Sequence, residues 1–238
     1  MGVRHAAGTH LRWAALLGAC VCMLGFAHGS YARIPVTVNE VTVSARPGET
    51  VGAVIDAVGG YESPKILADR NVPATFFMLG SCVDKRPAVA RAVVQAGHAV
   101  GNHTYRHTRL DATTPTTAEW EIRATNWAIQ QATGARPHWL RAPGGRLEGP
   151  AAAYISASGM ASALWTVDPQ DWRKEATSAG IADTVIRSVR PGAIVVLHDG
   201  GGDRSATIAA LPVIIDRLRA AGYEFVTLDE MPAVRATW

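Results

Sequence analysis

Cysteine is scarce in this chain, and its positions exclude a disulfide-stabilised fold. Only three of the 238 residues are cysteine, and Cys20 and Cys22 lie in an N-terminal segment that has the pattern of a leader. Once such a leader is removed, Cys82 remains alone and no intramolecular disulfide can form. The mature protein must therefore be stabilised by its hydrophobic core, for which a composition of 48% hydrophobic residues is sufficient.

The chain also lacks a large excess of charge of either sign, since its net charge is only +3. The sequence contains no basic stripe and no pair of aromatic residues in an RNA-binding pattern, so we expect no nucleic-acid partner. The 238 residues are enough for one large α/β domain or two small ones.

A long apolar run is missing as well. The most apolar segment, residues 13–27, follows the basic residues Arg4 and Arg12 and ends shortly before small residues at Ser30 and Ala32. This is the pattern of a signal peptide cut after about Ala32, and the run is short for a membrane span of roughly 20 residues. We expect a secreted or cell-surface protein without a stable membrane span after cleavage; an uncleaved anchor and a lipoprotein leader are the alternatives.

From residue 63 onward, predicted strands and amphipathic helices alternate. The strands are expected at 73–79, 98–101, 138–140, 161–167, 193–197 and 224–228, and the helices at 64–70, 84–96, 117–133, 149–158, 176–189 and 205–221. Alternation of this kind predicts βα units and a right-handed parallel sheet. Six strands without a glycine-rich phosphate loop favour a barrel over a dinucleotide-binding sheet.

Polar residues follow four successive strands of this pattern. They are His103 and His107, then Arg141, then Asp168 and Asp171, and finally His198. In parallel α/β barrels the carboxyl ends of the strands form the active-site face, so these loops should meet at one rim.

The histidine pair indicates a metal site. In a helix or a tight turn, the spacing of four residues places His103 and His107 on one side, where neutral imidazole suits zinc and similar metals. A catalytic zinc usually has three protein ligands, so a third must come from elsewhere in the chain.

The remaining polar residues fit a metal-assisted hydrolysis of an amide or ester. His198 could donate a proton to the leaving group, and Asp171 could hold the other ring nitrogen of His198 and favour the protonated ring. Arg141 could hold a carboxylate through two hydrogen bonds. Trp172 could form an apolar wall for a sugar ring.

Together these motifs resemble the polysaccharide deacetylase family, the NodB-homology domain of carbohydrate esterase type. The resemblance covers about residues 63–228 and rests on His103-Thr104-x-x-His107, Arg141-x-Pro143, Asp168-x-x-Asp171-Trp172, Leu197-His198-Asp199, the segment 74–77 and the glycine-rich tail 200–205.

The resemblance implies an α/β fold, a distorted (β/α)7 barrel that removes N- or O-acetyl groups from polymers such as chitin, peptidoglycan or xylan. It implies zinc, or another divalent transition metal, on His103 and His107. It implies His198 as general acid tuned by Asp171, and Arg141 as the residue that positions the base. The substrate contacts would come from Pro143, Gly144, Trp172 and Leu197. Gly144 replaces the usual tyrosine and leaves a backbone N–H for an oxyanion.

The first motif of the family departs from its pattern. The family has Thr-Phe-Asp-Asp-Gly-Pro, whose first Asp is the base and whose second is a metal ligand, whereas residues 54–59 here are Val-Ile-Asp-Ala-Val-Gly. Asp56 then takes the place of the base, and Ala57 takes the place of the third metal ligand and cannot bind a metal. The first strand is thus degenerate, or missing if residues 33–60 belong to a β-grasp-like module in which Asp56 is a surface residue. From the residues alone, 50–60 could form a strand ending at Asp56 or a short helix ending at the double glycine.

We therefore expect a signal peptide over residues 1–32, an N-terminal β segment over 33–60 and a polysaccharide deacetylase domain over 61–238. The predicted function is metal-dependent deacetylation of a cell-wall-type polysaccharide by a monomer. The alternatives are a catalytically inactive carbohydrate-binding homologue that lacks the third ligand, and a damaged homologue that folds poorly.

Overall fold

A parallel β-sheet organises the part of the chain that carries the predicted motifs. The computed structural model describes residues 51–57, 62–147 and 150–231, and the side chains of these residues except 51–57 and Pro150. The predicted leader and most of the segment 33–60 lie outside the described residues.

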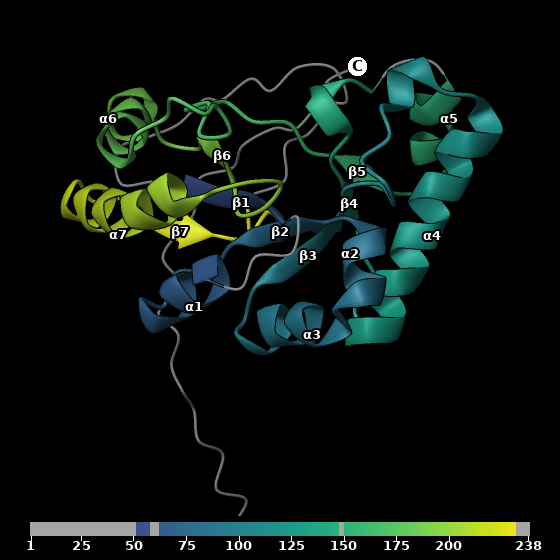
Figure 1. Cartoon of the computed structure of the whole chain (residues 1–238), viewed down its shortest axis with the longest axis horizontal. Helices are drawn as coiled ribbons and strands as arrows, with labels where there is room; N and C mark the ends of the chain where they lie inside the picture. Colours follow the sequence, from purple (N-terminus) through teal and green to yellow (C-terminus); the bar gives the residue numbers. More distant parts are fainter. Residues whose placement is uncertain (1–50, 58–61, 148–149, 232–238) are drawn as a thin grey trace, which may run out of the picture. The chain divides into compact units, whose positions relative to one another are not determined.

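Seven strands form one sheet in which every pairing is parallel (Figure 1). The strands are β1 (Val51–Ala57), β2 (Thr75–Met78), β3 (Ala99–Asn102), β4 (Trp139–Leu140), β5 (Ala161–Ser162), β6 (Ile194–His198) and β7 (Phe225–Val226). Their order is β5-β4-β3-β2-β1-β6, and β7 also pairs with β1. The predicted parallel α/β architecture is confirmed.

The segment after β5 closes this sheet. Val167 forms a parallel bridge with Val195 of β6, and the Val167 carbonyl accepts a hydrogen bond from the Val196 N–H at 3.0 Å. Residues 161–167 therefore contact β4 at one end and β6 at the other, which gives the expected distorted barrel. The single strand predicted over this range is interrupted because the chain changes its partner between the two ends.

A strand occupies the first position of the barrel. β1 pairs with both β2 and β6, and Asp56 lies opposite Phe77 on one side and His198 on the other. The interpretation of residues 50–60 as a strand is thus confirmed over the short helix, and the first strand is not missing.

The helices follow the predicted pattern with one break. They are α1 (Glu62–Asp69), α2 (Gly80–Lys85), α3 (Pro87–Gln95), α4 (Pro115–Thr133), α5 (Pro150–Ser158), α6 (Ser178–Ser188) and α7 (Ser205–Ala220), with 3-10 turns η1 (Leu110–Ala112) and η2 (Pro143–Gly145). The single helix predicted over 84–96 is instead the pair α2 and α3. Arg86 leaves the helical region, with φ −139° and ψ 61°, because the ring of Pro87 disfavours helical geometry in the preceding residue.

Helices cover the sheet in groups that pack on one another. α6 packs against α7, and α4 packs against α2, α3 and α5 (Figure 1). The interior holds fully buried apolar side chains such as Phe76, Ile129, Ile181 and Ile215, each of which contributes roughly 2–3 kcal/mol through removal from water. This core fixes the strand ends from which the functional side chains project.

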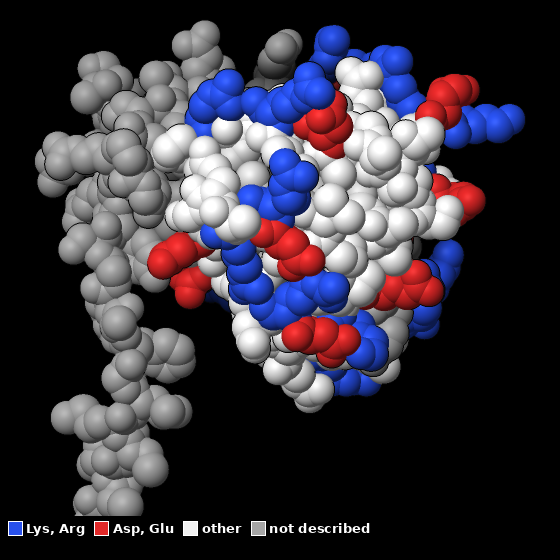
Figure 2. All heavy atoms as spheres, turned by 90° about the vertical axis from the view of Figure 1, so that its left-hand side faces the viewer, with Lys and Arg blue, Asp and Glu red and all other residues white. Residues whose placement is uncertain are grey.

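The surface is mixed in charge. On the face that carries α6 and α7, basic and acidic side chains are interspersed (Figure 2), and Arg187 pairs with Asp183 one turn away on α6. No helix in the described ranges is long and apolar enough to cross a membrane.

Candidate functional site

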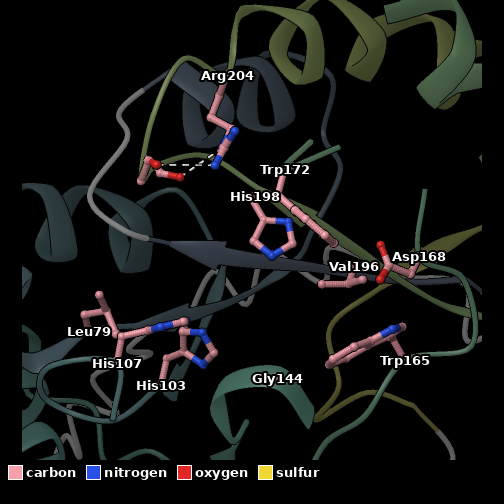
Figure 3. A pocket seen from close by; sticks show the side chains of 12 residues that line it. Leu79, His103, His107, Gly144, Trp165, Asp168, Trp172, Val196, His198 and Arg204 are labelled. Atoms are coloured by element: carbon pink, nitrogen blue, oxygen red, sulfur yellow. Dashed lines mark hydrogen bonds between the residues drawn. The ribbon is translucent and has the colours of Figure 1, made fainter. Parts of the chain in front are cut away.

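A cavity of about 590 Å³ opens at the carboxyl ends of the strands. His103 and His107 lie side by side at one edge, His198 and Trp172 lie across from them, and Trp165 and Asp168 lie further along the same opening (Figure 3). Leu79, Gly144, Val196, Gly200, Gly201 and Arg204 complete the lining. The structure therefore brings all four of the predicted loops, those after β3, β4, β5 and β6, to one pocket.

The histidine pair lies on a turned loop after β3. Thr104 and His107 both have left-handed backbones, with φ 66° and 63°, and the His103 and His107 ring centroids are 5.0 Å apart at an edge-on angle of 70°. A turn thus brings the two imidazoles together. The sequence allows either a helix or a tight turn here, and the structure has the turn.

Two buried polar residues hold this loop. Glu121 of α4 accepts hydrogen bonds from the Tyr105 N–H (2.7 Å), the Arg106 N–H (2.8 Å) and the Thr108 hydroxyl (2.7 Å). Asn102 accepts from the Thr104 N–H at 2.8 Å. The left-handed conformation is strained for L-amino acids other than glycine. These hydrogen bonds therefore stabilise the left-handed backbone of the loop.

The neighbouring strand fixes the orientation of His103. Its Nδ1 lies 2.9 Å from the carbonyl oxygen of Arg141, and a carbonyl can only accept, so Nδ1 carries the proton. The lone pair then resides on Nε2, which is the atom through which such a histidine binds a metal.

Arg141 is fully buried directly after β4. Its guanidinium lies 4.6 Å from the ring centre of Phe77 and 5.3 Å from that of Trp165, and it donates at long range to the carbonyls of Ala163 and Leu164. Phe77 can occupy this place because Gly101 has no side chain; a Cβ there would stand 2.5 Å from the Phe77 ring. The carboxylate expected to pair with Arg141 is that of Asp56, whose side chain is outside the described set.

His198 lies at the end of β6 in a network with Asp171. The Asp171 carboxylate is 2.7 Å from His198 Nδ1 and accepts hydrogen bonds from the His198 backbone N–H and the Thr207 hydroxyl, both at 2.8 Å. The predicted contact between Asp171 and His198 is present. It holds Nδ1 and leaves Nε2 for the pocket, as a residue that transfers a proton requires.

Aromatic and glycine residues shape the opening of the pocket. Trp172 is 48% exposed and lines the cavity together with Trp165. Gly144 has φ 70°, and a Cβ placed on it would meet no atom within 4 Å, so this wall is open.

Two predicted substrate contacts lie behind the pocket wall. Pro143 is buried at the start of η2, and Leu197 packs in the hydrophobic core, while its neighbour Val196 lines the cavity. Side chains alternate between the two faces of a strand, so Val196 rather than Leu197 lines the cavity.

His103 and His107 are the described side chains that could donate to a metal in this pocket. Among the described side chains, no three His, Cys, Asp or Glu groups come together as a ligand set. The backbone register places Asp56 beside His198, and Ala57 beside Met78. Two imidazoles fit part of the ligand set of a borderline divalent metal.

Comparison with known proteins decides the family. A family model described as polysaccharide deacetylase matches residues 62–163. A chitooligosaccharide deacetylase from Bradyrhizobium sp. is 35% identical over 178 residues, which cover 70% of this chain and 81% of that protein. A peptidoglycan-N-acetylglucosamine deacetylase from Bacillus cereus is 33% identical over 168 residues, covering 70% and 78%.

The chain belongs to the polysaccharide deacetylase family. Its relatives are named as deacetylases, which are hydrolases of carbon–nitrogen bonds other than peptide bonds. The family match begins at residue 62, after β1, where the first motif of this chain departs from the family pattern.

Solved structures of the family include both active and inactive members. The chain superimposes with TM-score 0.71 on a family 4 pseudoenzyme from Bacillus anthracis, at 29% identity and coverage of 78% and 66%. A mutant of this pseudoenzyme with restored enzymatic activity gives 0.72 at 30% identity, covering 78% and 68%. The structure of a peptidoglycan N-acetylglucosamine deacetylase gives 0.74 at 27% identity, covering 79% and 90%. The fold is therefore shared by members with and without turnover.

Several residues around this polysaccharide deacetylase pocket were not predicted from the sequence pattern. Glu121 and Thr207 act on the site from helices, and Trp165 and Arg204 line the pocket. Glu121 could have been noticed, because it interrupts the buried face of α4 formed by Ala118, Ile122 and Thr125. Thr207 gives no comparable signal, since a threonine in the first turn of a helix is common.

Proposed function

We propose that this chain is a secreted carbohydrate deacetylase that hydrolyses the N-acetyl groups of an N-acetylglucosamine polymer with a bound divalent metal. The observation that carries the proposal is the hydrogen-bonded network of His198, Asp171 and Thr207 across the pocket from His103 and His107. The named activities of the relatives on chitooligosaccharide and peptidoglycan favour N-acetyl over O-acetyl groups.

His198 would act on the leaving group. Its Nε2 faces the cavity while Asp171 holds Nδ1, so the protonated ring can donate to the amine nitrogen as the carbon–nitrogen bond breaks. The Thr207 hydroxyl and the His198 backbone N–H also bind the carboxylate, which keeps Asp171 oriented toward the ring.

The opposite wall would orient the acetyl group. His103 and His107 would hold zinc or a similar metal, with Asp56 or water in the position that Ala57 cannot fill. A bound divalent metal supplies polarisation of the acetyl carbonyl and acidification of water. Trp172 and Trp165 would pack against the sugar ring, and the Gly144 N–H would meet the oxygen on which negative charge develops.

A carbohydrate-binding function without catalysis is the second candidate. Ala57 removes a side-chain ligand, and the chain resembles a family 4 pseudoenzyme in structure as well as it resembles active members. A carbohydrate-binding protein without turnover would keep the pocket and Trp172 but release no acetate.

Acetate release from N-acetylglucosamine oligomers separates the two functions. The assay compares protein treated with a chelator, protein resupplied with zinc, and His198→Ala. Release that needs zinc and is lost in the variant supports the deacetylase. No release from folded protein that still binds the oligomer supports the binding protein.

Secretion has a separate test. Export of the protein with Arg33 as its first residue, read by N-terminal sequencing of the material outside the cell, is the expected result. A mature protein that begins at Met1 or Cys20 would contradict the cut after Ala32.

A further inference from the structure

α4 carries two tryptophans that do not belong to the core. Trp120 is 42% exposed and Trp127 is 61% exposed. They are seven residues apart, so two turns of helix place them on one face, about 10.5 Å apart along the axis at a rise of 1.5 Å per residue. We call these two residues the α4 tryptophan pair.

The buried face of α4 is turned away from this pair. Its inward residues are Ala118, Glu121, Ile122, Thr125, Ala128, Ile129 and Ala132. Trp120 and Trp127 fall between these positions, on the outer side of a helix that lies at the edge of the structure in Figure 1. Exposed indole rings add nothing to the core, so their apolar area is available to a ligand.

One member of the pair contacts the histidine loop that borders the pocket. The Trp120 ring packs edge-on against Tyr105 with centroids 5.0 Å apart, and the Arg106 guanidinium lies 4.5 Å from the centre of the Trp120 ring. The next residue of the same loop, His107, lines the cavity. A chain lying along α4 would therefore reach the histidine edge of the pocket.

We propose that the α4 tryptophan pair binds a β-linked N-acetylglucosamine polymer outside the pocket. A pyranose ring presents an apolar C–H face that can pack on an indole, and two such rings span about 10 Å, at bond lengths of about 1.5 Å. The guanidinium of Arg106 supplies donors for hydroxyl and acetamide oxygens beside the rings.

The surface would hold polymer near the catalytic groups. Retention next to the pocket raises the local concentration of acetyl groups without a new contact at the reacting bond. The inference takes its polymer from the proposed function, but it requires binding only and not turnover.

The test is sedimentation of the full chain with insoluble chitin. Trp127→Ala should raise the Kd for chitin about tenfold, whereas Trp127→Tyr, which keeps a stacking ring, should raise it only about twofold. Val213→Ala is the matched control, because Val213 is 48% exposed on α7. Acetate release from soluble tri-N-acetylglucosamine should be unchanged in all three variants, and thermal melts should show that each is folded.

Several outcomes would overturn the inference. They are wild-type protein that does not sediment with chitin, Trp127→Ala that binds as tightly as wild type, and an equal loss in Val213→Ala, which would indicate unspecific apolar adsorption. A dimer in solution that Trp127→Ala dissociates would show that a second copy covers the face. Failure of the proposed function gives a different result: no acetate from the soluble oligomer, with chitin binding retained.

Discussion

The two walls of the pocket use a buried carboxylate in different ways. On the β6 wall, Asp171 binds the ring of His198 itself. On the β3 wall, Glu121 binds the backbone of the loop between His103 and His107 and touches neither ring in these bonds. The first carboxylate orients the ring of one histidine, and the second holds the loop that carries a histidine pair.

This difference shows where the site is intact and where it is not. The β6 wall has the proposed acid, His198, and its partner Asp171, while the β3 wall has the hydrogen bonds of Glu121 and the two proposed ligands. Among the metal ligands expected from the family, the departure is then one side chain at the end of β1, Ala57, because the residues that shape the histidine loop remain in place. A site altered so locally is open to repair by a single substitution.

Removal of the acid should have the largest effect. His198→Ala should lower the rate of acetate release about 10²- to 10⁴-fold, because the proposed mechanism takes the proton for the leaving amine from His198. The zinc content measured by elemental analysis should not change, since His198 lies on the other wall. A rate equal to wild type would remove His198 from the mechanism, and loss of zinc would place it among the ligands.

Repair of the first motif should act in the opposite direction. Ala57→Asp adds a carboxylate at the strand end and should raise zinc affinity and acetate release about 10- to 100-fold, the order of the loss seen when a partner of a metal ligand is removed. Calorimetric titration with zinc measures the affinity, and the deacetylation assay measures acetate release.

The control for this repair is Ala57→Asn, which has a similar size but no charge. If both variants match wild type in zinc affinity, Asp56 or water already completes the site and Ala57 is not the deficiency. A related pseudoenzyme has regained activity as a mutant, so the fold is compatible with recovery.

The position of the acid wall could be predicted from the sequence, but the supports of both walls could not. Strand ends in a parallel barrel meet at one rim, so His198 and Asp171 were expected to come together although 27 residues separate them. Glu121 and Thr207 reach the site from helices, and their direction depends on how those helices rotate on the sheet. Packing in three dimensions sets that rotation, and local pattern does not.

The ends of the strands also depend on tertiary contacts that the local sequence pattern does not predict. The order of helices and strands follows from apolar periodicity, whereas the interruption of strand 161–167 depends on a change of partner from β4 to β6. Likewise Leu197 and Val196 are both apolar, and only the register of β6 determines which one faces the pocket.

Release of the histidine loop should have a smaller effect than loss of the acid. Glu121→Ala leaves three donors without their acceptor and should lower the free energy of unfolding by about 3 kcal/mol. Zinc affinity should fall with it, because Thr104 and His107 can leave their left-handed conformations. Glu119→Ala is the matched control on the same helix: its exposed pair with Arg123 contributes less than about 1 kcal/mol. Equal effects of the two substitutions on urea unfolding would show that Glu121 does not hold the loop.

The smallest effect concerns His98, a histidine that precedes β3 at the end opposite His103. Burial lowers the pKa of His98 below its ordinary value of 6.5, against the opposing effect of the hydrogen bond to the Pro64 carbonyl. As the pH falls below about 6.5, His98 therefore binds a proton in the unfolded chain but not yet in the folded protein. The free energy of unfolding then decreases by at most about 1.4 kcal/mol per pH unit. His98→Gln keeps a donor for Pro64 but has no such proton, so its urea midpoint should change less than that of wild type between pH 7.5 and pH 5.5. If the urea midpoints of the two proteins fall equally with pH, His98 is not the source of the loss of stability in acid.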